Sequence, residues 1–121
     1  MPHSYNPQNI FARILRGEIP NKTVMESPHT LAFHDIAPQA PVHVLVIPKG
    51  AYATFDHFAA DGSEAEIADF HRTCAKIVAM MDLGSGYRVI SNAGGDSGQE
   101  VPHYHLHILG GRMLGPMLLR P

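Results

Sequence analysis

Residues 42–47 read Val-His-Val-Leu-Val-Ile, and this run constrains the fold more than any other segment of the chain. Its residues are β-branched and almost continuously apolar, a pattern typical of a strand that is covered on both faces. Pro48, Lys49 and Gly50 follow directly and predict the end of the strand. We therefore expect this strand to lie at the centre of a sheet.

Two helices are predicted from capping residues and apolar spacing. Asn9 is placed to cap a short helix over residues 10–16. The capping-box pair Ser63 and Glu66 begins a second helix, whose apolar residues keep helical spacing over about five turns. Gly84 is a plausible C-terminal cap for this long helix.

The other strands are expected before and after the long helix in the sequence. Residues 51–62 show no clear preference for helix or strand. Because the strands run in groups rather than alternating with helices, we predict an α+β fold with an antiparallel sheet. The further strands are expected over residues 23–26, 30–34, 87–90 and 104–109, the last begun at His103 and the first two paired as a hairpin.

Length and composition exclude several classes of protein. The 121 residues show no linker or repeat, so we expect one domain over residues 1–121, with flexible segments at 1–8 and 113–121. Nine Lys and Arg against 11 Asp and Glu give a net charge of −2, which argues against nucleic acid or an anionic membrane as a partner. One cysteine excludes an internal disulfide framework. Without a signal peptide or an apolar run of about 20 residues, a cytoplasmic protein with no membrane partner is expected.

Nine histidines are the unusual feature of the composition. Three of them, His103, His105 and His107, alternate along one predicted strand, so their side chains are expected on the same face. Three imidazoles on one face indicate chemistry more than packing, because histidine is the side chain most used for proton transfer and metal ligation near neutral pH. The intervening residues, expected to face the core, are Tyr104, Leu106 and Ile108.

Two kinds of chemistry fit this pattern. In the first, strand histidines together with His43 bind zinc and leave an open position, although no acid is placed to support a histidine ligand. In the second, the glycine-rich loop at 92–99 offers backbone N–H groups to a phosphate, with Asn92 and Gln99 as further donors. A histidine beside such a loop favours phosphoryl or nucleotidyl transfer through a histidine nucleophile.

The histidine strand also carries a family resemblance. Residues 103–109, His-Tyr-His-Leu-His-Ile-Leu, resemble the signature His-φ-His-φ-His-φ-φ of the histidine-triad (HIT) family. Residues 33–49 are similar to the first signature of its Hint branch. The segments Ile10-Phe11 and Gly17-Glu18-Ile19-Pro20 also match, and Gly110-Gly111-Arg112 favours the Hint branch over the dinucleoside-polyphosphate branch. The tail lacks the tryptophan of animal members, so the chain resembles the bacterial form.

The resemblance implies a purine nucleoside phosphoramidase. Such an enzyme cleaves the P–N bond of a nucleoside 5′-phosphoramidate through a covalent nucleotidyl-histidine and releases the nucleoside monophosphate. His105 would be the nucleophile, and His103 would orient it through its main-chain carbonyl. His107 would contact phosphate oxygens, and His43 would complete the hydrogen-bonded network. The resemblance implies no cofactor and no metal.

Residues for the substrate follow from the same resemblance. Asp35 would accept the ribose hydroxyls, and Glu100 replaces a serine found near the leaving group in animal members. The implied fold is a five-stranded antiparallel sheet with one long and one short helix, extended across a homodimer that buries the apolar face of the long helix. Ile36, Phe11 and Ile14 would form the slot for the purine base, and Asn92, Gly98 and Gln99 would hold ribose and phosphate.

Two alternatives stay open beside this enzyme. One is a nucleotide-binding or interaction protein that binds without turnover, and the other is a zinc enzyme on the same histidines. Cys74 is expected to be a buried small hydrophobic residue, and His34 to have a packing or surface role. The histidines expected on the surface are His3, His29, His57 and His71.

Overall fold

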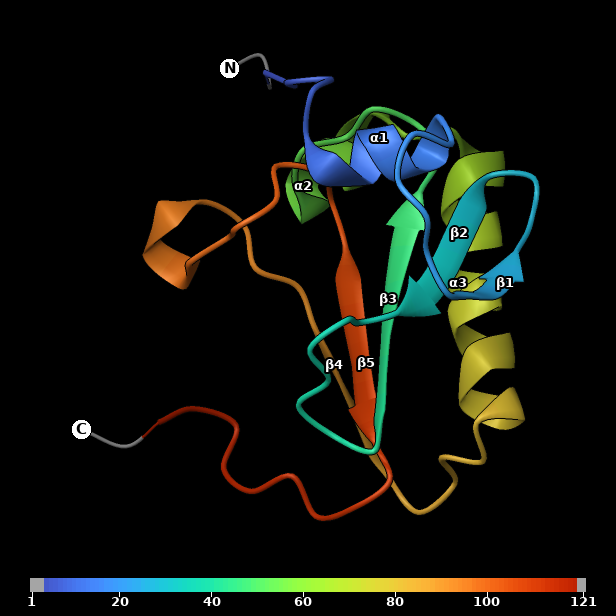
Figure 1. The fold of residues 1–121 in the computed structure, drawn as a ribbon, viewed down its shortest axis with the longest axis vertical. Helices are drawn as coiled ribbons and strands as arrows, with labels where there is room; N and C mark the ends of the chain where they lie inside the picture. Colours follow the sequence, from blue (N-terminus) through green and yellow to red (C-terminus); the bar gives the residue numbers. More distant parts are fainter. Residues whose placement is uncertain (1–3, 120–121) are drawn as a thin grey trace.

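A five-stranded antiparallel sheet organises the computed structural model, which describes residues 4–119 (Figure 1). The strand order is β1-β2-β3-β5-β4, which confirms the run at 42–47 as the central strand. All five predicted strands are present, but the last begins at Leu106 rather than at His103, so His103 and His105 precede it. The strands are β1 (Thr23–Glu26), β2 (Thr30–His34), β3 (Val42–Pro48), β4 (Tyr87–Ile90) and β5 (Leu106–Gly110).

Three α-helices accompany the sheet, one more than the resemblance implied: α1 (Ile10–Leu15), α2 (Phe55–Asp61) and α3 (Glu64–Met80). The additional helix, α2, forms in the segment without a clear preference, where the Thr54 side chain accepts from the backbone N–H of His57. The predicted caps at Asn9 and at the Ser63–Glu66 box are confirmed. The helix α3 ends at Met80 with Met81 as its C-cap, rather than at the predicted cap Gly84. The next residue, Asp82, has left-handed backbone at φ 55°.

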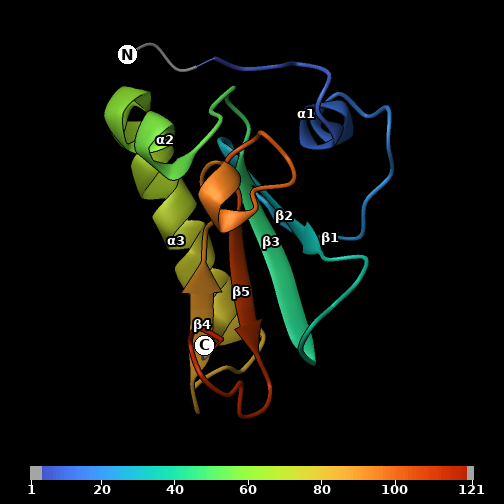
Figure 2. The ribbon, with the colours of Figure 1, turned by 90° about the vertical axis from the view of Figure 1, so that its left-hand side faces the viewer.

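The two faces of the sheet carry separate apolar clusters, which explains the continuous apolar run of β3. Val44 and Val46 pack on the side of α3, whereas Leu45 and Ile47 pack on the side of α1. Figure 2 shows α3 and α1 on opposite sides of the sheet. The apolar face of α3 packs against β1, β2 and β3 of its own chain, with Phe70 and Ile77 fully buried and Ile67, Cys74 and Val78 partly buried. That a dimer covers more of this helix stays a prediction.

Two of the histidines expected on the surface are placed differently. His57 is buried, and its Nδ1 accepts a hydrogen bond of 2.9 Å from the backbone N–H of Ala53. His29 is half-buried beside α3, and His71 is exposed as expected. His3 lies outside the described residues.

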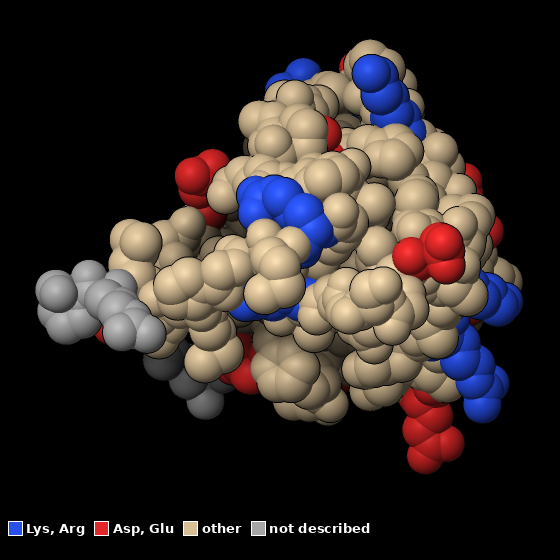
Figure 3. All heavy atoms as spheres, turned by 90° about the horizontal axis from the view of Figure 1, so that it is seen from below, with Lys and Arg blue, Asp and Glu red and all other residues tan. Residues whose placement is uncertain are grey.

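The surface carries mixed charge on the face drawn in Figure 3, where Lys and Arg side chains stand among Asp and Glu. This mixture agrees with the net charge of −2 and shows no continuous basic stripe on that face. Among residues 4–119, no helix combines the length and the apolar character that crossing a membrane requires.

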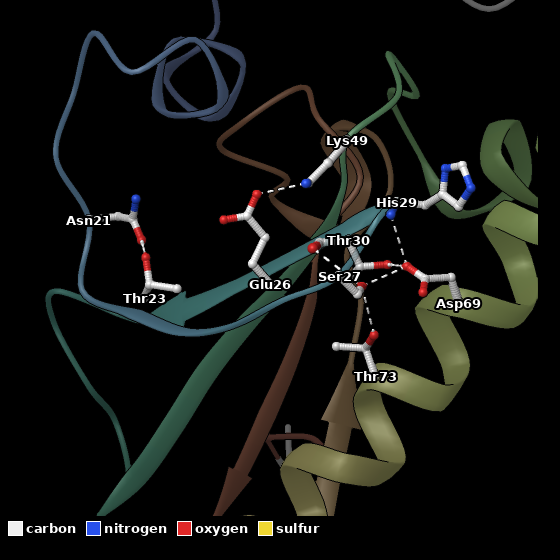
Figure 4. A network of polar contacts seen from close by, with 9 residues as sticks. All are labelled: Asn21, Thr23, Glu26, Ser27, His29, Thr30, Lys49, Asp69 and Thr73. Carbon is white, nitrogen blue, oxygen red and sulfur yellow. Dashed lines mark hydrogen bonds and ion pairs between the residues drawn. The ribbon is translucent and has the colours of Figure 1, made fainter.

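Asp69 on α3 ties the helix to the turn between β1 and β2 (Figure 4). Its Oδ2 accepts hydrogen bonds from the Ser27 hydroxyl at 2.7 Å, the Thr30 hydroxyl at 2.7 Å and the backbone N–H of His29 at 3.1 Å. Burial raises the pKa of the Asp69 carboxyl, but these three donors outweigh it and hold the pKa below its ordinary value. The carboxylate therefore holds the β1–β2 hairpin against α3 by accepting three hydrogen bonds.

Removing that acceptor should destabilise the fold. We expect Asp69→Ala to lower the free energy of unfolding by about 2–4 kcal/mol, because three donors lose a charged partner. Denaturant unfolding followed by circular dichroism measures the loss. The exposed Asp82→Asn, which suits the left-handed backbone there, is the control and should change stability by less than about 0.5 kcal/mol. A loss below about 1 kcal/mol in Asp69→Ala would contradict the assigned role.

Candidate active site

A cavity of about 590 Å³ opens beside α1, the loop after β2, the glycine-rich loop and β5. The two predicted site residues that do not line it, His43 and His103, contact lining residues through hydrogen bonds. The fold therefore brings together residues from five separate segments of the chain. The predicted site residues that line the cavity are Phe11, Ile14, Asp35, Ile36, Asn92, Gly98, Gln99, Glu100, His105 and His107.

His105 is buried at the wall of this cavity with one ring nitrogen engaged. Its Nδ1 lies 2.7 Å from the main-chain carbonyl oxygen of His103. A carbonyl only accepts, so Nδ1 carries the proton and Nε2 keeps its lone pair in the neutral ring. The ring packs edge-on against Phe11 with centroids 5.0 Å apart, which limits its rotation. The arrangement leaves Nε2 with a lone pair and holds the ring in one orientation.

His103 is held by two further partners and is 0% exposed. Its Nε2–H donates to the carbonyl oxygen of Pro48 at 2.8 Å, so Nδ1 accepts from the Tyr5 hydroxyl at 2.6 Å. Burial lowers the pKa of His103 to about 4, which keeps the ring neutral at neutral pH. The residue thus positions His105 by its backbone while its side chain anchors the segment to the end of β3.

The contact between Tyr5 and His103 was not predicted from the sequence. Tyr5 lies in the segment 1–8, which we expected to be flexible; residues 1–3 are outside the described part of the chain. Besides its hydrogen bond, its ring meets that of His103 edge-on at 5.6 Å. A tyrosine 98 positions away carries no local signal of this contact. The cavity also has apolar lining residues that the sequence did not single out: Ile10, Ile19, Leu45 and Val101.

His43 and His107 form a second hydrogen-bonded pair. The backbone N–H of Gln39 donates to His43 Nδ1 at 3.1 Å, so the neutral His43 carries its proton on Nε2. That proton faces His107 Nδ1 at 2.9 Å and Asp35 Oδ2 at 3.4 Å. His107 consequently carries its own proton on Nε2, where it can donate to an anion.

Burial keeps these imidazoles uncharged. It lowers the pKa of His43 against the opposing charge of Asp35, and it lowers the pKa of His107 to about 4 with help from His105 and His43. Burial also lowers the pKa of His105, although the His103 carbonyl and the Asp35 charge act in the opposite direction. At neutral pH the site therefore presents one nucleophilic lone pair and one N–H donor.

The same residues can be tested against a metal ion. One ligand atom each from Asp35, His43 and His107 lies within 4.8 Å of the others, close enough for one ion. A histidine that ligates through Nε2 carries its proton on Nδ1 and donates it to an acceptor. His43 Nδ1 instead accepts from the Gln39 N–H, so His43 would have to break that bond to become a ligand. The donor set fits a proton relay better than a zinc centre.

The glycine-rich loop is shaped by left-handed backbone at Gly94 and Gly98, with φ of 79° and 77°. Gln99 holds this loop through its side chain: Oε1 accepts from the Gly94 N–H at 2.9 Å, and Nε2 donates to the carbonyls of Ala53 and Val101. Its amide is thus already engaged by the protein, whereas we expected it to hold ribose and phosphate. In the structure it is an anchor of the loop at the cavity wall.

The entrance of the cavity is apolar on one side. Ile36 is 99% exposed in the loop after β2, Ile14 is half-buried on α1, and Phe11 is buried beneath them. An isoleucine left this exposed has no partner of its own within the described chain and is suited to cover a flat ring. Asp35 precedes it, with its Oδ1 accepting from the Ala37 N–H at 2.8 Å.

Fold and site together define a protein that presents a buried, neutral histidine to a cavity of small-molecule size. Residues 16–114 match the model of the HIT domain, and the chain belongs to the HIT family. It is 54% identical to a HIT-like protein of Azospirillum brasilense over 121 residues, 99% of each chain. It is 42% identical to the purine nucleoside phosphoramidase of Escherichia coli over 112 residues, 92% of this chain and 93% of that one. The crystal structure of a HIT family hydrolase from Legionella pneumophila superimposes with a TM-score of 0.80 at 43% identity, covering 88% of this chain and 95% of that chain.

The neutral His103 predicts a loss of stability in acid. Its pKa is about 4 in the folded state and about 6.5 in the unfolded state, so between these values the unfolded chain binds the proton and the folded one does not. Stability should therefore fall as pH drops below 6.5, and this residue should account for about 2 kcal/mol at pH 5. Urea unfolding at pH 7 and pH 5 measures the difference.

The variant His103→Asn isolates this contribution. Its unfolding free energy should change by about 2 kcal/mol less between the two pH values than that of the unchanged protein. The exposed His71→Asn controls for the removal of one histidine and should keep the original difference. An identical pH dependence in His103→Asn and the unchanged protein would show that His103 is not the buried neutral group described above.

Proposed function

We propose that this chain is a HIT-family hydrolase that cleaves the P–N bond of purine nucleoside 5′-phosphoramidates. The observation that carries the proposal is the hydrogen bond of His105 Nδ1 to the His103 carbonyl, because it directs the Nε2 lone pair of a buried neutral imidazole to the substrate cavity. The relative named purine nucleoside phosphoramidase supports the choice of bond. The substrate is an adenosine or guanosine monophosphate joined to an amine.

The first step transfers the nucleotide to the protein. The His105 Nε2 lone pair forms a bond to the α-phosphorus as the P–N bond breaks, and the departing nitrogen takes up a proton to leave as a free amine. The attacked ring becomes positively charged, and the His103 carbonyl oxygen at Nδ1 stabilises that charge. The protonated Nε2 of His107 donates to a phosphoryl oxygen.

The second step releases the product. Water attacks the phosphorus on the nucleotidyl-His105, the P–Nε2 bond breaks, and the water proton leaves so that neutral His105 is restored. Nucleoside monophosphate is the product, and one water is consumed for each amine released. The His43–His107 pair and Asp35 offer a short relay along which a proton can move, since their polar atoms lie 2.9 and 3.4 Å apart.

Binding of the nucleoside follows from the rest of the cavity. Ile36, Ile14 and Phe11 supply the apolar slot for the base, and the Asp35 carboxylate, which already contacts the Ala37 N–H through Oδ1 and His43 Nε2 through Oδ2, is the acceptor for ribose hydroxyls. The side chain of Asn92 and backbone N–H groups of the glycine-rich loop hold ribose and phosphate, as neutral donors suited to an anion. The N–H groups of Gly94, Gly98 and Gln99 are hydrogen-bonded within the loop, so the donors are those of its other residues.

The nucleophile is tested by replacing it. His105→Asn should lower turnover of adenosine 5′-phosphoramidate by at least about 10³-fold, because no other group can form the covalent intermediate. Binding of AMP, measured by calorimetry, should stay within about threefold, since the base and ribose contacts are unchanged. The exposed His71→Asn is the control for activity. Substantial turnover by His105→Asn would disprove the assignment, and AMP binding with no turnover by the unchanged protein would instead favour a binding module.

A homodimer is proposed with this activity. Strand β4 is an outer strand of the sheet, and Tyr87 and Val89 on it are each 51% exposed, which leaves a backbone edge and apolar side chains for a second copy. Sedimentation velocity should give a dimer, which Val89→Asp should convert to monomer. The control Ile36→Asp introduces the same charge at another exposed aliphatic residue and should leave the dimer intact. A monomer in the unchanged protein would rule the dimer out.

A further inference from the structure

The buried ring of His103 has two polar nitrogens, and each needs a hydrogen-bond partner. Its Nε2–H donates to the Pro48 carbonyl, so Nδ1 keeps a lone pair that calls for a donor. Within the described residues that donor is the Tyr5 hydroxyl, 2.6 Å away. A buried acceptor without a donor costs free energy, so this one hydroxyl completes the satisfaction of the ring in its present position.

Tyr5 belongs to residues 5–15, a segment that contains α1 and that we call the N-terminal strap. The strap precedes residues 16–114, the range that matches the HIT domain model. Arg16 holds the start of the strap, since its guanidinium donates to the Pro7 carbonyl at 2.7 Å. The donor for the buried histidine therefore comes from outside the matched range, on a segment with an anchor of its own.

The strap contacts two of the three alternating histidines. The ring of Phe11 lies edge-on to that of His105 with centroids 5.0 Å apart, and to that of His103 with centroids 6.4 Å apart. The ring of Tyr5 lies edge-on to that of His103 at 5.6 Å. Phe11 lines the cavity, whereas Tyr5 does not. Tyr5 thus supports the His103 ring without forming part of the cavity wall.

The ring of His103 and the carbonyl that orients His105 belong to the same residue. That carbonyl oxygen lies 2.7 Å from His105 Nδ1. A shift of the His103 ring would therefore move the acceptor that keeps the proton of His105 on Nδ1. Hydrogen bonds weaken steeply as their angle departs from linear, so a small displacement is enough to loosen this one. The Tyr5 hydroxyl is linked to His105 through a single intervening residue.

We propose that Tyr5 is a positioning residue, whose hydroxyl holds the His103 ring so that the His103 carbonyl keeps the proton of His105 on Nδ1. This inference rests on the proposed function for the reaction that His105 performs, but the tautomer of His105 can be measured without any reaction. Because Tyr5 acts through His103 and does not line the cavity, its removal should affect kcat and leave binding nearly unchanged.

Tyr5→Phe tests the proposal, since it removes the hydroxyl and keeps the aromatic ring against His103. We expect kcat for adenosine 5′-phosphoramidate to fall about tenfold, because a misplaced nucleophile attacks less well. KM and the Kd for AMP should stay within about twofold, because the lining of the cavity is unchanged. A purely structural role of Tyr5 would lower the free energy of unfolding and leave kcat of the folded protein as it was.

Tyr52→Phe is the matched control. Tyr52 is also half-buried, and its hydroxyl donates to the Glu66 carboxylate at 2.8 Å rather than to a histidine. Each variant loses one hydrogen-bonded hydroxyl, so both should unfold at a lower denaturant concentration than the unchanged protein. Only Tyr5→Phe should lower kcat. An equal fall of kcat in both variants would mean a general loss of stability and would overturn the positioning role.

Nitrogen-15 NMR of the histidine rings gives a readout that needs no turnover. Protonated and unprotonated ring nitrogens resonate far apart, so the spectrum reports the tautomer of each neutral histidine. The unchanged protein should carry the proton of His105 on Nδ1 and that of His103 on Nε2. Tyr5→Phe should show His105 as a mixture of both tautomers, and Tyr52→Phe should match the unchanged protein.

The outcomes separate this inference from the proposed function. If the unchanged protein hydrolyses no phosphoramidate, the proposed function fails, and the tautomer of His105 in Tyr5→Phe still decides the inference. If Tyr5→Phe keeps both kcat and the His105 tautomer, the inference is overturned while the enzyme assignment stands. A rise in KM and in the Kd for AMP at unchanged kcat would place Tyr5 in substrate binding and would also overturn it.

Discussion

The hydrogen bond from His103 Nε2 to the Pro48 carbonyl is the contact on which the site depends. It joins the end of the central strand to the segment that leads into β5, across 55 positions of the chain. Because His103 is fully buried, its position sets the carbonyl oxygen that holds His105 Nδ1. The proposed nucleophile, His105, is therefore oriented by the backbone of the sheet core, which is more rigid than a surface loop.

A second consequence of burial is that the imidazoles of the site are neutral at neutral pH. The depressed pKa values of His103, His105 and His107 leave neutral rings, so in the mechanism we propose His105 needs no separate base to remove a proton before attack. In that mechanism, positive charge arises on His105 only as the new bond forms. The His103 carbonyl oxygen, already in contact with Nδ1, would stabilise that charge. No Lys or Arg lines the described part of the cavity, so in the function we propose the phosphate is held by neutral dipoles.

Much of the fold was predictable because its signals are local. Periodicity located all five strands and two of the three helices, and the capping residues Asn9 and Ser63 marked where the helices begin. The helix α2 was missed because residues 51–62 show no clear preference and the cap at Thr54 was not recognised in the sequence. His57 was misplaced as a surface residue for a related reason: it is buried once α2 forms, with its ring against Tyr52 and its Nδ1 accepting from the Ala53 N–H.

The amino-acid sequence by itself determined that alternate histidines would share one face and that a glycine-rich loop would precede them, since both follow from spacing along the chain. It also carried the family resemblance, which the match over residues 16–114 confirms. Only the tertiary structure decided which nitrogen of each ring bears the proton, because that depends on partners distant in sequence: Tyr5 and Pro48 for His103, and His43 for His107. It likewise turned Gln99 inward as a loop anchor and left Glu100 facing the cavity, a division between neighbouring residues that no local pattern contains.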